Sequence, residues 1–162
     1  MGKYNFANQQ TGRQLQGYKV VMANLRKEMA KIQRRSVKGL LKAAILIRRD
    51  MDTTPPLIPV DLGNLRASSF IIAGNGQSRT AGSFSGPDSA RMNADHSSVI
   101  AKERGKVTGK LSVAIGFSAH YAGIVEADTT TKRKRSGAGG GFFEMALQRN
   151  APLILEVIKK ER

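Results

Sequence analysis

His120, Tyr121 and Glu126 are the residues of this sequence that could take part in acid–base chemistry, because they share one short segment. A general acid or base needs a nucleophile, an oxyanion hole or a second carboxylate placed to act with it. The sequence supplies none of these at a useful spacing, so we expect no enzymatic activity. The pattern favours His120 as a loop or interface residue.

Metal and cofactor sites are predicted to be absent. The chain has no Cys and only two His, at positions 96 and 120, which excludes a disulfide framework and a Cys/His metal cluster. It also lacks a Gly-Lys-Ser/Thr motif and a strand-to-helix glycine pattern for nucleotide phosphates. Asp61 could act as a metal ligand or a base. Beside Leu62-Gly63-Asn64, however, it is predicted to cap a turn by accepting hydrogen bonds from backbone N–H groups.

The net charge indicates which neighbours the protein has. With 27 Lys and Arg against 12 Asp and Glu, the net charge is +15 and the pI is about 10.7, which favours polyanionic neighbours. An acidic protein partner or a solvated basic surface explains this charge as well as DNA does. Aromatic residues make up 6% of the chain and Trp is absent, so no stacking platform for single-stranded nucleic acid is predicted. The side chains that could contact DNA or an acidic partner are Arg79, Arg91, Lys132, Arg133, Lys134 and Arg135.

Hydrophobic periodicity predicts a long basic amphipathic helix over residues 19–51, followed by Pro55-Pro56, which requires the helix to end by Thr54. Gly39 could bend its middle. Such a helix could cover a core, lie on a membrane surface or bind as calmodulin targets do. Few bulky aromatics and the sheet that follows favour the core. The apolar positions of this helix are Met22, Leu25, Met29, Ile32, Val37, Leu40, Leu41, Ala44, Ile45 and Ile47.

The remaining segments predict an α+β fold, in which the long N-terminal helix and a C-terminal helix pack on a mainly antiparallel β-sheet with long loops. Strands are predicted at residues 67–73, 98–101 and 110–117, with an antiparallel hairpin as the simplest pairing. Residues 74–97 are predicted to be a long loop that reaches a neighbour, and residues 127–141 a flexible basic and glycine-rich loop. The C-terminal helix covers residues 142–158, with a kink or restart at Pro152. The predicted core consists of Leu40, Leu41, Ile45, Leu65, Phe70, Ile72, Val113, Ile115, Tyr121, Val125, Phe143 and Leu147.

The domain organisation is predicted to be simple. Residues 19–162 are long enough for one domain, and residues 1–18 are polar and aperiodic, which is typical of a flexible arm that orders on a partner. No run of about 18 apolar residues and no charged-then-apolar start occur, so we expect neither a membrane span nor a signal peptide. Synthesis and folding in the cytoplasm are expected.

Three short motifs occur along the chain: Asp61-Leu62-Gly63-Asn64-Leu65-Arg66-Ala67-Ser68, then Tyr121-Ala122-Gly123-Ile124-Val125-Glu126, then Phe142-Phe143-Glu144-Met145-Ala146. In this order they resemble the tail-completion, or minor tail, family of tailed phages. The resemblance covers about residue 22 to the C-terminus. The family pattern has an acid–x–Gly–x–Leu–Arg–x–Ser segment, a Tyr-Ala followed by a glutamate, and a Phe-rich start to the last helix. One departure is that the family commonly has Gly-Thr soon after the glutamate, where this chain has Ala127-Asp128-Thr129. The residues that match the motifs are Asp61, Gly63, Leu65, Arg66, Tyr121, Ala122, Glu126, Phe142, Phe143 and Ala146.

The resemblance implies a structural virion protein located at the head–tail junction. Such subunits assemble as a ring, often six-fold, that caps the tail tube or bridges it to the head-side connector, with DNA passing through the lumen. The expected partners are therefore further copies of the chain, tail tube or terminator proteins and head-side connector proteins. Contact with genomic DNA would be transient and non-specific, because phosphate attraction needs no base-reading residues. Two alternatives are a free-standing basic nucleic-acid-binding protein and another minor, capsid-associated virion component.

Overall fold

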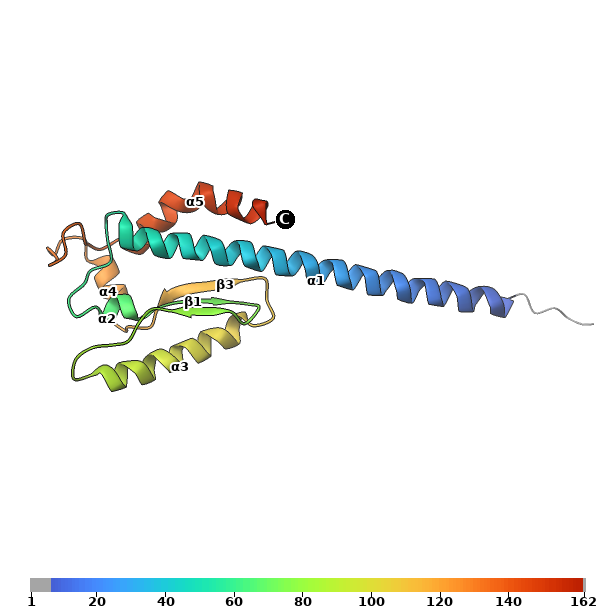
Figure 1. The fold of residues 1–162 in the computed structure, drawn as a ribbon, viewed down its shortest axis with the longest axis horizontal. Helices are drawn as coiled ribbons and strands as arrows, with labels where there is room; N and C mark the ends of the chain where they lie inside the picture. The colour runs from blue at the N-terminus through green and yellow to red at the C-terminus, as the bar shows by residue number, and fades with distance from the viewer. Residues whose placement is uncertain (1–6, 162) are drawn as a thin grey trace, which may run out of the picture. The chain divides into compact units, whose positions relative to one another are not determined.

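The computed structural model describes the backbone of residues 7–161 and the side chains of residues 19–161. Its fold is α+β, as predicted: long N- and C-terminal helices accompany a three-stranded antiparallel sheet (Figure 1). The elements in chain order are α1 (Ala7–Thr53), α2 (Asn64–Ala67), β1 (Ser69–Ala73), β2 (Ser78–Thr80), α3 (Ser89–Val107), β3 (Val113–Phe117), α4 (Ala122–Ala127) and α5 (Phe142–Lys160).

The chain forms two compact units, residues 1–34 and residues 35–162. The described part of the first unit consists of the N-terminal part of α1, which begins at Ala7. Residues 7–18, predicted to be an arm without fixed structure, are therefore helical, and residues 1–6 lie outside the described part. Gln, Arg and Leu between positions 9 and 16 favour a helix even without an apolar stripe. The predicted domain boundary at residue 18 thus falls inside a continuous helix.

The apolar stripe of the first unit is exposed. Leu25, Met29 and Ile32 leave 52%, 53% and 61% of their surface exposed, so the prediction that this part of α1 packs on a core is wrong. Buried positions on α1 begin at Val37 and continue through Leu41 to Met51. The hydrophobic period therefore runs through both parts of α1, but its apolar residues are buried only from Val37 onward. Periodicity alone does not distinguish the exposed part from the buried part.

The sheet has the strand order β2-β1-β3, and β1 pairs antiparallel with both neighbours. Ile71 of β1 lies opposite Arg79 on one side and opposite Ile115 on the other. The hairpin joins β1 to β2 through a tight turn that contains Gly76 at a φ of 87°. The predicted pairing of residues 98–101 with residues 110–117 is wrong, because the first of these segments is helical.

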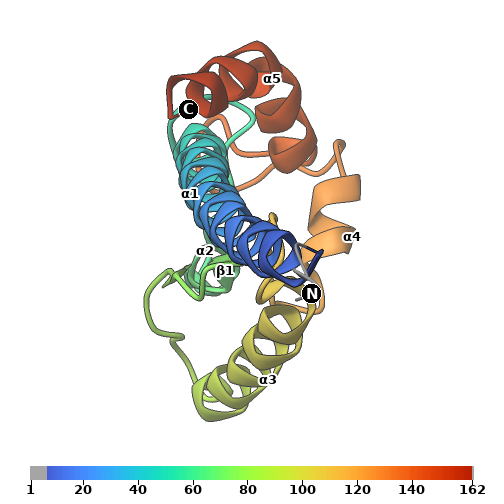
Figure 2. The same cartoon turned by 90° about the vertical axis from the view of Figure 1, so that its right-hand side faces the viewer.

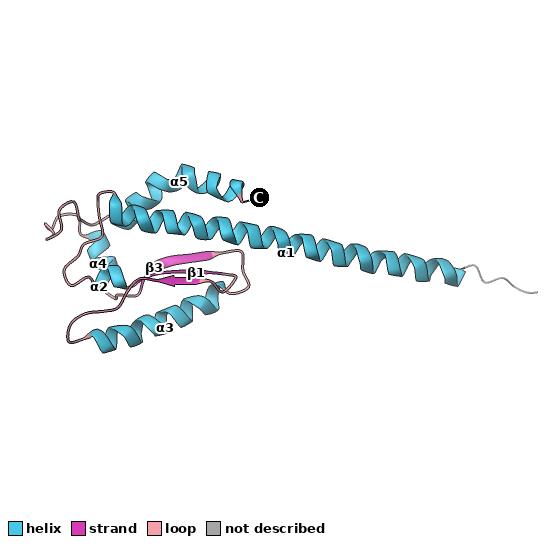
Figure 3. Ribbon diagram, viewed as in Figure 1, coloured by secondary structure: helices cyan, strands magenta, loops and turns pink. Residues whose placement is uncertain are grey.

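Both faces of β1 are buried, because a helix covers each face of the sheet (Figures 1 and 3). Ile71 and Ala73 pack against Val37 and Leu41 of α1. On the opposite face, Phe70 and Ile72 pack against Val107 of α3, with Val99 and Ile100 beside them. The central strand is consequently apolar at successive positions instead of alternating.

α3 replaces the second half of the predicted loop 74–97 and the predicted strand 98–101. The many polar residues of this segment suggested a loop. Its apolar residues nevertheless recur at helical spacing, at Met92, Val99, Ile100 and Val107. Only residues 81–88 remain as a connection there. Asn64 holds this connection in place, since its side chain accepts a hydrogen bond from the Ser85 N–H (2.8 Å) and donates one to the Ser85 carbonyl (2.9 Å).

α5 packs on α1, with Gly39 at the point of closest approach. A Cβ on Gly39 would lie 3.0 Å from Cα of Ile158, so glycine lets the two helices meet. The expected bend at Gly39 does not interrupt α1. Glu161 at the end of α5 pairs with Lys38 (3.0 Å) and with Lys42. Pro152 lies inside α5, which continues as one helix to Lys160 instead of restarting and changes direction along its length in Figure 2.

The buried core overlaps the predicted set only in part. Leu41, Leu65, Phe70 and Ile72 are buried, whereas the other predicted core residues are half-buried. The side chains that sequence analysis missed include the most deeply buried ones, namely Met51, Ile58 and Phe142. Ile58 follows the proline pair in a segment without hydrophobic periodicity, so no pattern predicted its burial.

Candidate functional site

The three motif segments meet in one cluster at the start of α5. Leu65, Phe142 and Ala146 belong to the same group of buried side chains, together with Met51 and Ile58. The partly buried Tyr121, Val125 and Phe143 pack against this group. The motifs therefore specify one local structure, although they are far apart in the sequence.

Glu126 links α4 to α5. Its carboxylate accepts hydrogen bonds from the backbone N–H groups of Phe143 (3.1 Å) and Glu144 (3.0 Å), and its carbonyl accepts one from the Gly141 N–H (2.7 Å). The first N–H groups of a helix have no partner within the helix, and Gly141 at the N-cap has no side chain to supply one. Glu126 therefore supplies the cap from another element, with a negative charge at the positive end of the helix dipole.

Gly140 makes this approach possible. A Cβ at this position would lie 2.4 Å from the carbonyl oxygen of Asp128 and 2.7 Å from that of Glu126. The glycine-rich stretch was predicted to be a linker, but Gly140 is buried and packs against backbone. Its conformation is therefore fixed by close contact, which a count of glycines cannot reveal.

Asp61 forms an exposed ion pair with Lys134. The predicted backbone cap is wrong, because Gly63 occupies the N-cap of α2, with a φ of 84° and no side-chain cap. Arg66, the last basic residue of the same motif, reaches back to Asp52 of α1 (3.0 Å). The first motif thus contributes two ion pairs and the buried Leu65.

The basic segment 132–135 is mostly engaged within the protein. Arg133 pairs with Asp128 at 2.8 Å, and Arg135 donates to the carbonyls of Asp52 (2.8 Å) and Ile58 (3.3 Å). Hydrogen bonds from Thr131 and Thr130 hold the pKa of Asp128 well below its usual range. With Lys134 bound to Asp61, Lys132 is the member of the segment without a partner among the described residues.

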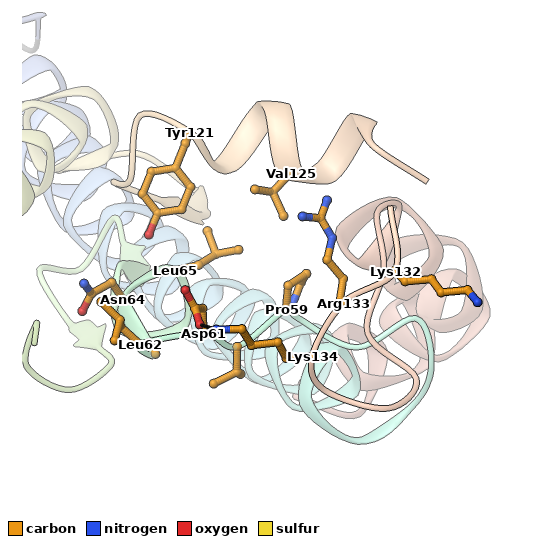
Figure 4. A pocket seen from close by; sticks show the side chains of 12 residues that line it. Pro59, Asp61, Leu62, Asn64, Leu65, Tyr121, Val125, Lys132, Arg133 and Lys134 are labelled. Carbon is orange, nitrogen blue, oxygen red and sulfur yellow. Dashed lines mark hydrogen bonds and ion pairs between the residues drawn. The ribbon is translucent and has the colours of Figure 1, made fainter. Parts of the chain in front are cut away.

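A cavity of about 370 Å³ opens between residues 59–65, α4 and residues 132–134 (Figure 4). Tyr121 and Val125 face Leu65 and Pro59 across it, and the guanidinium of Arg133 points toward Val125. The side chain of Lys132 points away from the cavity in Figure 4. The cavity therefore combines an apolar wall with Tyr and Arg donors.

The other predicted contact residues lie elsewhere. Arg79 is exposed on β2 and Arg91 is exposed on α3, and neither lines the cavity. His120 is exposed and borders a smaller cavity of about 260 Å³, on the side where Ser118 lies. The candidate acid–base segment is thus divided, since Glu126 caps α5 whereas His120 faces another cavity.

His96 is a polar residue that sequence analysis did not single out. Its Nδ1 lies 2.6 Å from Oγ of Ser118, and its Nε2 is buried without a partner among the described residues. Phe84 contacts the ring edge-on at 5.5 Å, and burial lowers the pKa of His96. Its place four residues after Met92 on the covered stripe of α3 is the signal that could have revealed it.

Within residues 7–161, no group of three or more His, Asp or Glu side chains could hold a metal ion. In the same range, no helix is both long enough and apolar enough to cross a membrane.

Comparison of the chain with models of protein families, with curated proteins and with solved structures finds no significant match in any of the three. The resemblance to tail-completion proteins therefore rests on the three motifs.

Proposed function

We propose that this chain is a structural virion protein of a tailed phage, a ring-forming tail-completion or neck subunit around the DNA channel. The observation that carries the proposal is the bond between Glu126 and the start of α5, around which all three motifs meet. Chance matches to short motifs would fall at unrelated places in the fold. Here each motif contributes a buried or capping residue to one cluster.

The charge supports a site close to DNA. Besides the net charge of +15, exposed cations are spread over several elements, among them Lys27 on α1, Arg79 on β2 and Arg91 on α3. A subunit beside a DNA path gains from such dispersed charge, because it attracts phosphates without reading bases. Dispersed contacts also leave the DNA free to move.

The main alternative is a free-standing nucleic-acid-binding protein. The cations of the first unit favour it, since Lys19, Arg26, Lys27, Lys31 and Arg34 are all exposed there. The basic segment 132–135 favours it less, because Arg133, Lys134 and Arg135 bind within the protein. The isolated chain should consequently bind duplex DNA weakly, with an affinity that falls steeply as salt rises.

Location in the particle tests the proposal. Purified virions of a phage that encodes the chain are labelled with antibodies raised against it and viewed by electron microscopy. Label at the head–tail junction is expected. Label over the capsid would support the capsid-associated alternative, and absence of the chain from purified virions would overturn the proposal in favour of the free-standing protein.

A further inference from the structure

The cavity beside Tyr121 contains a hydrogen-bond donor that the described residues leave unsatisfied, the Tyr121 hydroxyl. Nε of Arg133 is shielded from solvent and has no hydrogen-bond partner, although Nη2 of the same side chain binds Asp128 at 2.8 Å. The Tyr121 hydroxyl has no partner either. Burial raises the pKa of Tyr121, so the hydroxyl keeps its proton at neutral pH and remains a donor. The Tyr121 hydroxyl is therefore the donor that the cavity offers to a ligand, because Nε of Arg133 has no solvent-accessible surface.

The charged side chains that line the cavity favour an anionic ligand as the hydrogen-bond acceptor. Three cations and one carboxylate line the cavity: Lys132, Arg133, Lys134 and Asp61. The side chains of the lining therefore carry three positive charges against one negative charge, although Lys134 pairs with Asp61, Arg133 pairs with Asp128, and Lys132 points away from the cavity. A cationic ligand would be repelled, whereas an anion gains from both the charge and the free donor.

The apolar side chains of the cavity favour an anion that also carries an apolar group. Pro59 and Leu65 on one side of the cavity, and Val125 and the ring of Tyr121 on the other, form its apolar lining. A nucleic-acid backbone would leave these side chains without apolar contacts. A volume of about 370 Å³ lies within the usual range of small-ligand sites and has room for a carboxylate with a neighbouring aliphatic side chain.

We propose that this cavity binds a peptide segment of a partner protein in which a carboxylate lies beside a branched apolar side chain. The carboxylate accepts a hydrogen bond from the Tyr121 hydroxyl and is attracted by the cations of the lining, and the apolar side chain packs against Val125 and Leu65. The proposal goes beyond the neck function, because the cavity, its donor and its charge belong to the isolated chain. A carboxyl-terminal residue and an internal Glu supply the same chemistry.

The test is a titration of the full ¹⁵N-labelled chain followed by NMR. The probes are acetyl-Gly-Leu-Glu-Leu-Gly-amide, its Gln counterpart, and the Gln peptide with a free C-terminal carboxylate after leucine. We expect the Glu peptide to shift amide signals around Tyr121, Val125 and Arg133, and to bind at least about tenfold more tightly than the amidated Gln peptide. Binding of the free-acid peptide would identify a chain terminus as the better source of the carboxylate.

A matched pair of variants locates the interaction. Tyr121→Phe keeps the ring and removes the hydroxyl, and should weaken the Glu peptide roughly tenfold. Lys110→Gln removes one exposed positive charge outside the cavity and should change binding by less than about twofold. The comparison of Glu and Gln peptides on the unchanged chain needs no variant, so it decides the question even if Tyr121→Phe folds poorly.

Three results would overturn the proposal. Equal binding of the Glu and the two Gln peptides would show that no carboxylate is recognised. Shifts confined to other surfaces would show that the cavity is not the site. Shifts at the cavity with a short DNA duplex but with none of the peptides would assign it to phosphate. None of these results bears on whether the chain is found at the head–tail junction, so the two proposals fail separately.

Discussion

The carboxylate of Glu126 accepts a hydrogen bond from the backbone N–H of Phe143, 3.1 Å away, although the two residues are 17 positions apart. Glu126 belongs to the short helix α4 and Phe143 to the first turn of α5. Phe142, between them, is almost fully buried against Met51 and Ile58. The cap thus determines where α5 begins, and the start of α5 anchors the core.

Removing the Glu126 carboxylate should destabilise the protein. Glu126→Ala leaves two N–H groups of α5 without acceptors and should lower the free energy of unfolding by about 1–3 kcal/mol. Glu126→Gln keeps an acceptor but loses the charge, so it should cost less. Glu144→Ala is the control, since this exposed residue lies in the same first turn and its side chain bonds only Gln148 among the described residues. Urea denaturation measures all three, and equal losses for the two alanine variants would contradict the capping role.

A large side chain at Gly39 should separate α5 from α1. Gly39→Leu places its Cβ 3.0 Å from Cα of Ile158, and the resulting shift should cost about 1–3 kcal/mol of stability. Gly105→Leu in α3 is the matched control, because no atom lies within 4 Å of a Cβ there. Leu favours a helix more than Gly does, so the control should gain up to about 0.8 kcal/mol. A loss of stability in both variants would mean that the contact at Gly39 is not the cause.

The elements that could be predicted from the sequence are those with a clear hydrophobic pattern. β1 was found from a short apolar run and α5 from a helical apolar period. β3 was found from its alternating pattern, although all five of its residues are half-buried. α3 was missed because its buried stripe is thin, and the first turns of α1 because they have no stripe at all.

The candidate site was predictable as a set of residues but not as contacts. The resemblance singled out Asp61, Tyr121 and Glu126, but the roles of Asp61 and Glu126 depend on partners far along the chain. Asp61 binds Lys134 and Glu126 binds the start of α5, and no local spacing encodes either pair. The cavity is likewise a product of three segments that tertiary packing brings together.

Polar substitutions in the exposed stripe of α1 should leave stability unchanged. Leu25→Gln and Ile32→Gln remove apolar side chains that are more than half exposed, so each should change the free energy of unfolding by less than about 0.5 kcal/mol. Leu41→Ala, at a buried position of the same helix, should cost about 2–5 kcal/mol. Thermal denaturation of the three variants checks this contrast. A loss at Ile32 as large as that at Leu41 would place residue 32 in a core.

His96 should make stability depend on pH in mildly acidic solution. Burial lowers the pKa of His96, so below the ordinary histidine pKa of about 6.5 the unfolded chain binds a proton that the folded chain refuses. Stability should therefore be constant above about pH 7 and fall as the pH drops below about 6.5, by up to about 1.4 kcal/mol per pH unit.

Replacement of His96 isolates this effect. His96→Gln should show a flat profile between about pH 7 and pH 5, whatever its stability at neutral pH. Asp128, whose pKa is held down by hydrogen bonds from Thr131 and Thr130, contributes only below the ordinary aspartate pKa of about 3.9, outside this window. Parallel profiles for the variant and the unchanged chain, from urea denaturation at each pH, would rule out His96 as the cause.

The neck function is tested most directly by electron microscopy of lysates from a phage in which the gene for this chain is deleted, with the unchanged gene supplied in trans as the control. The account predicts DNA-filled heads beside unattached or overgrown tails in the deletion, and joined virions when the gene is restored. Normal, infectious virions in its absence would contradict a role at the head–tail junction.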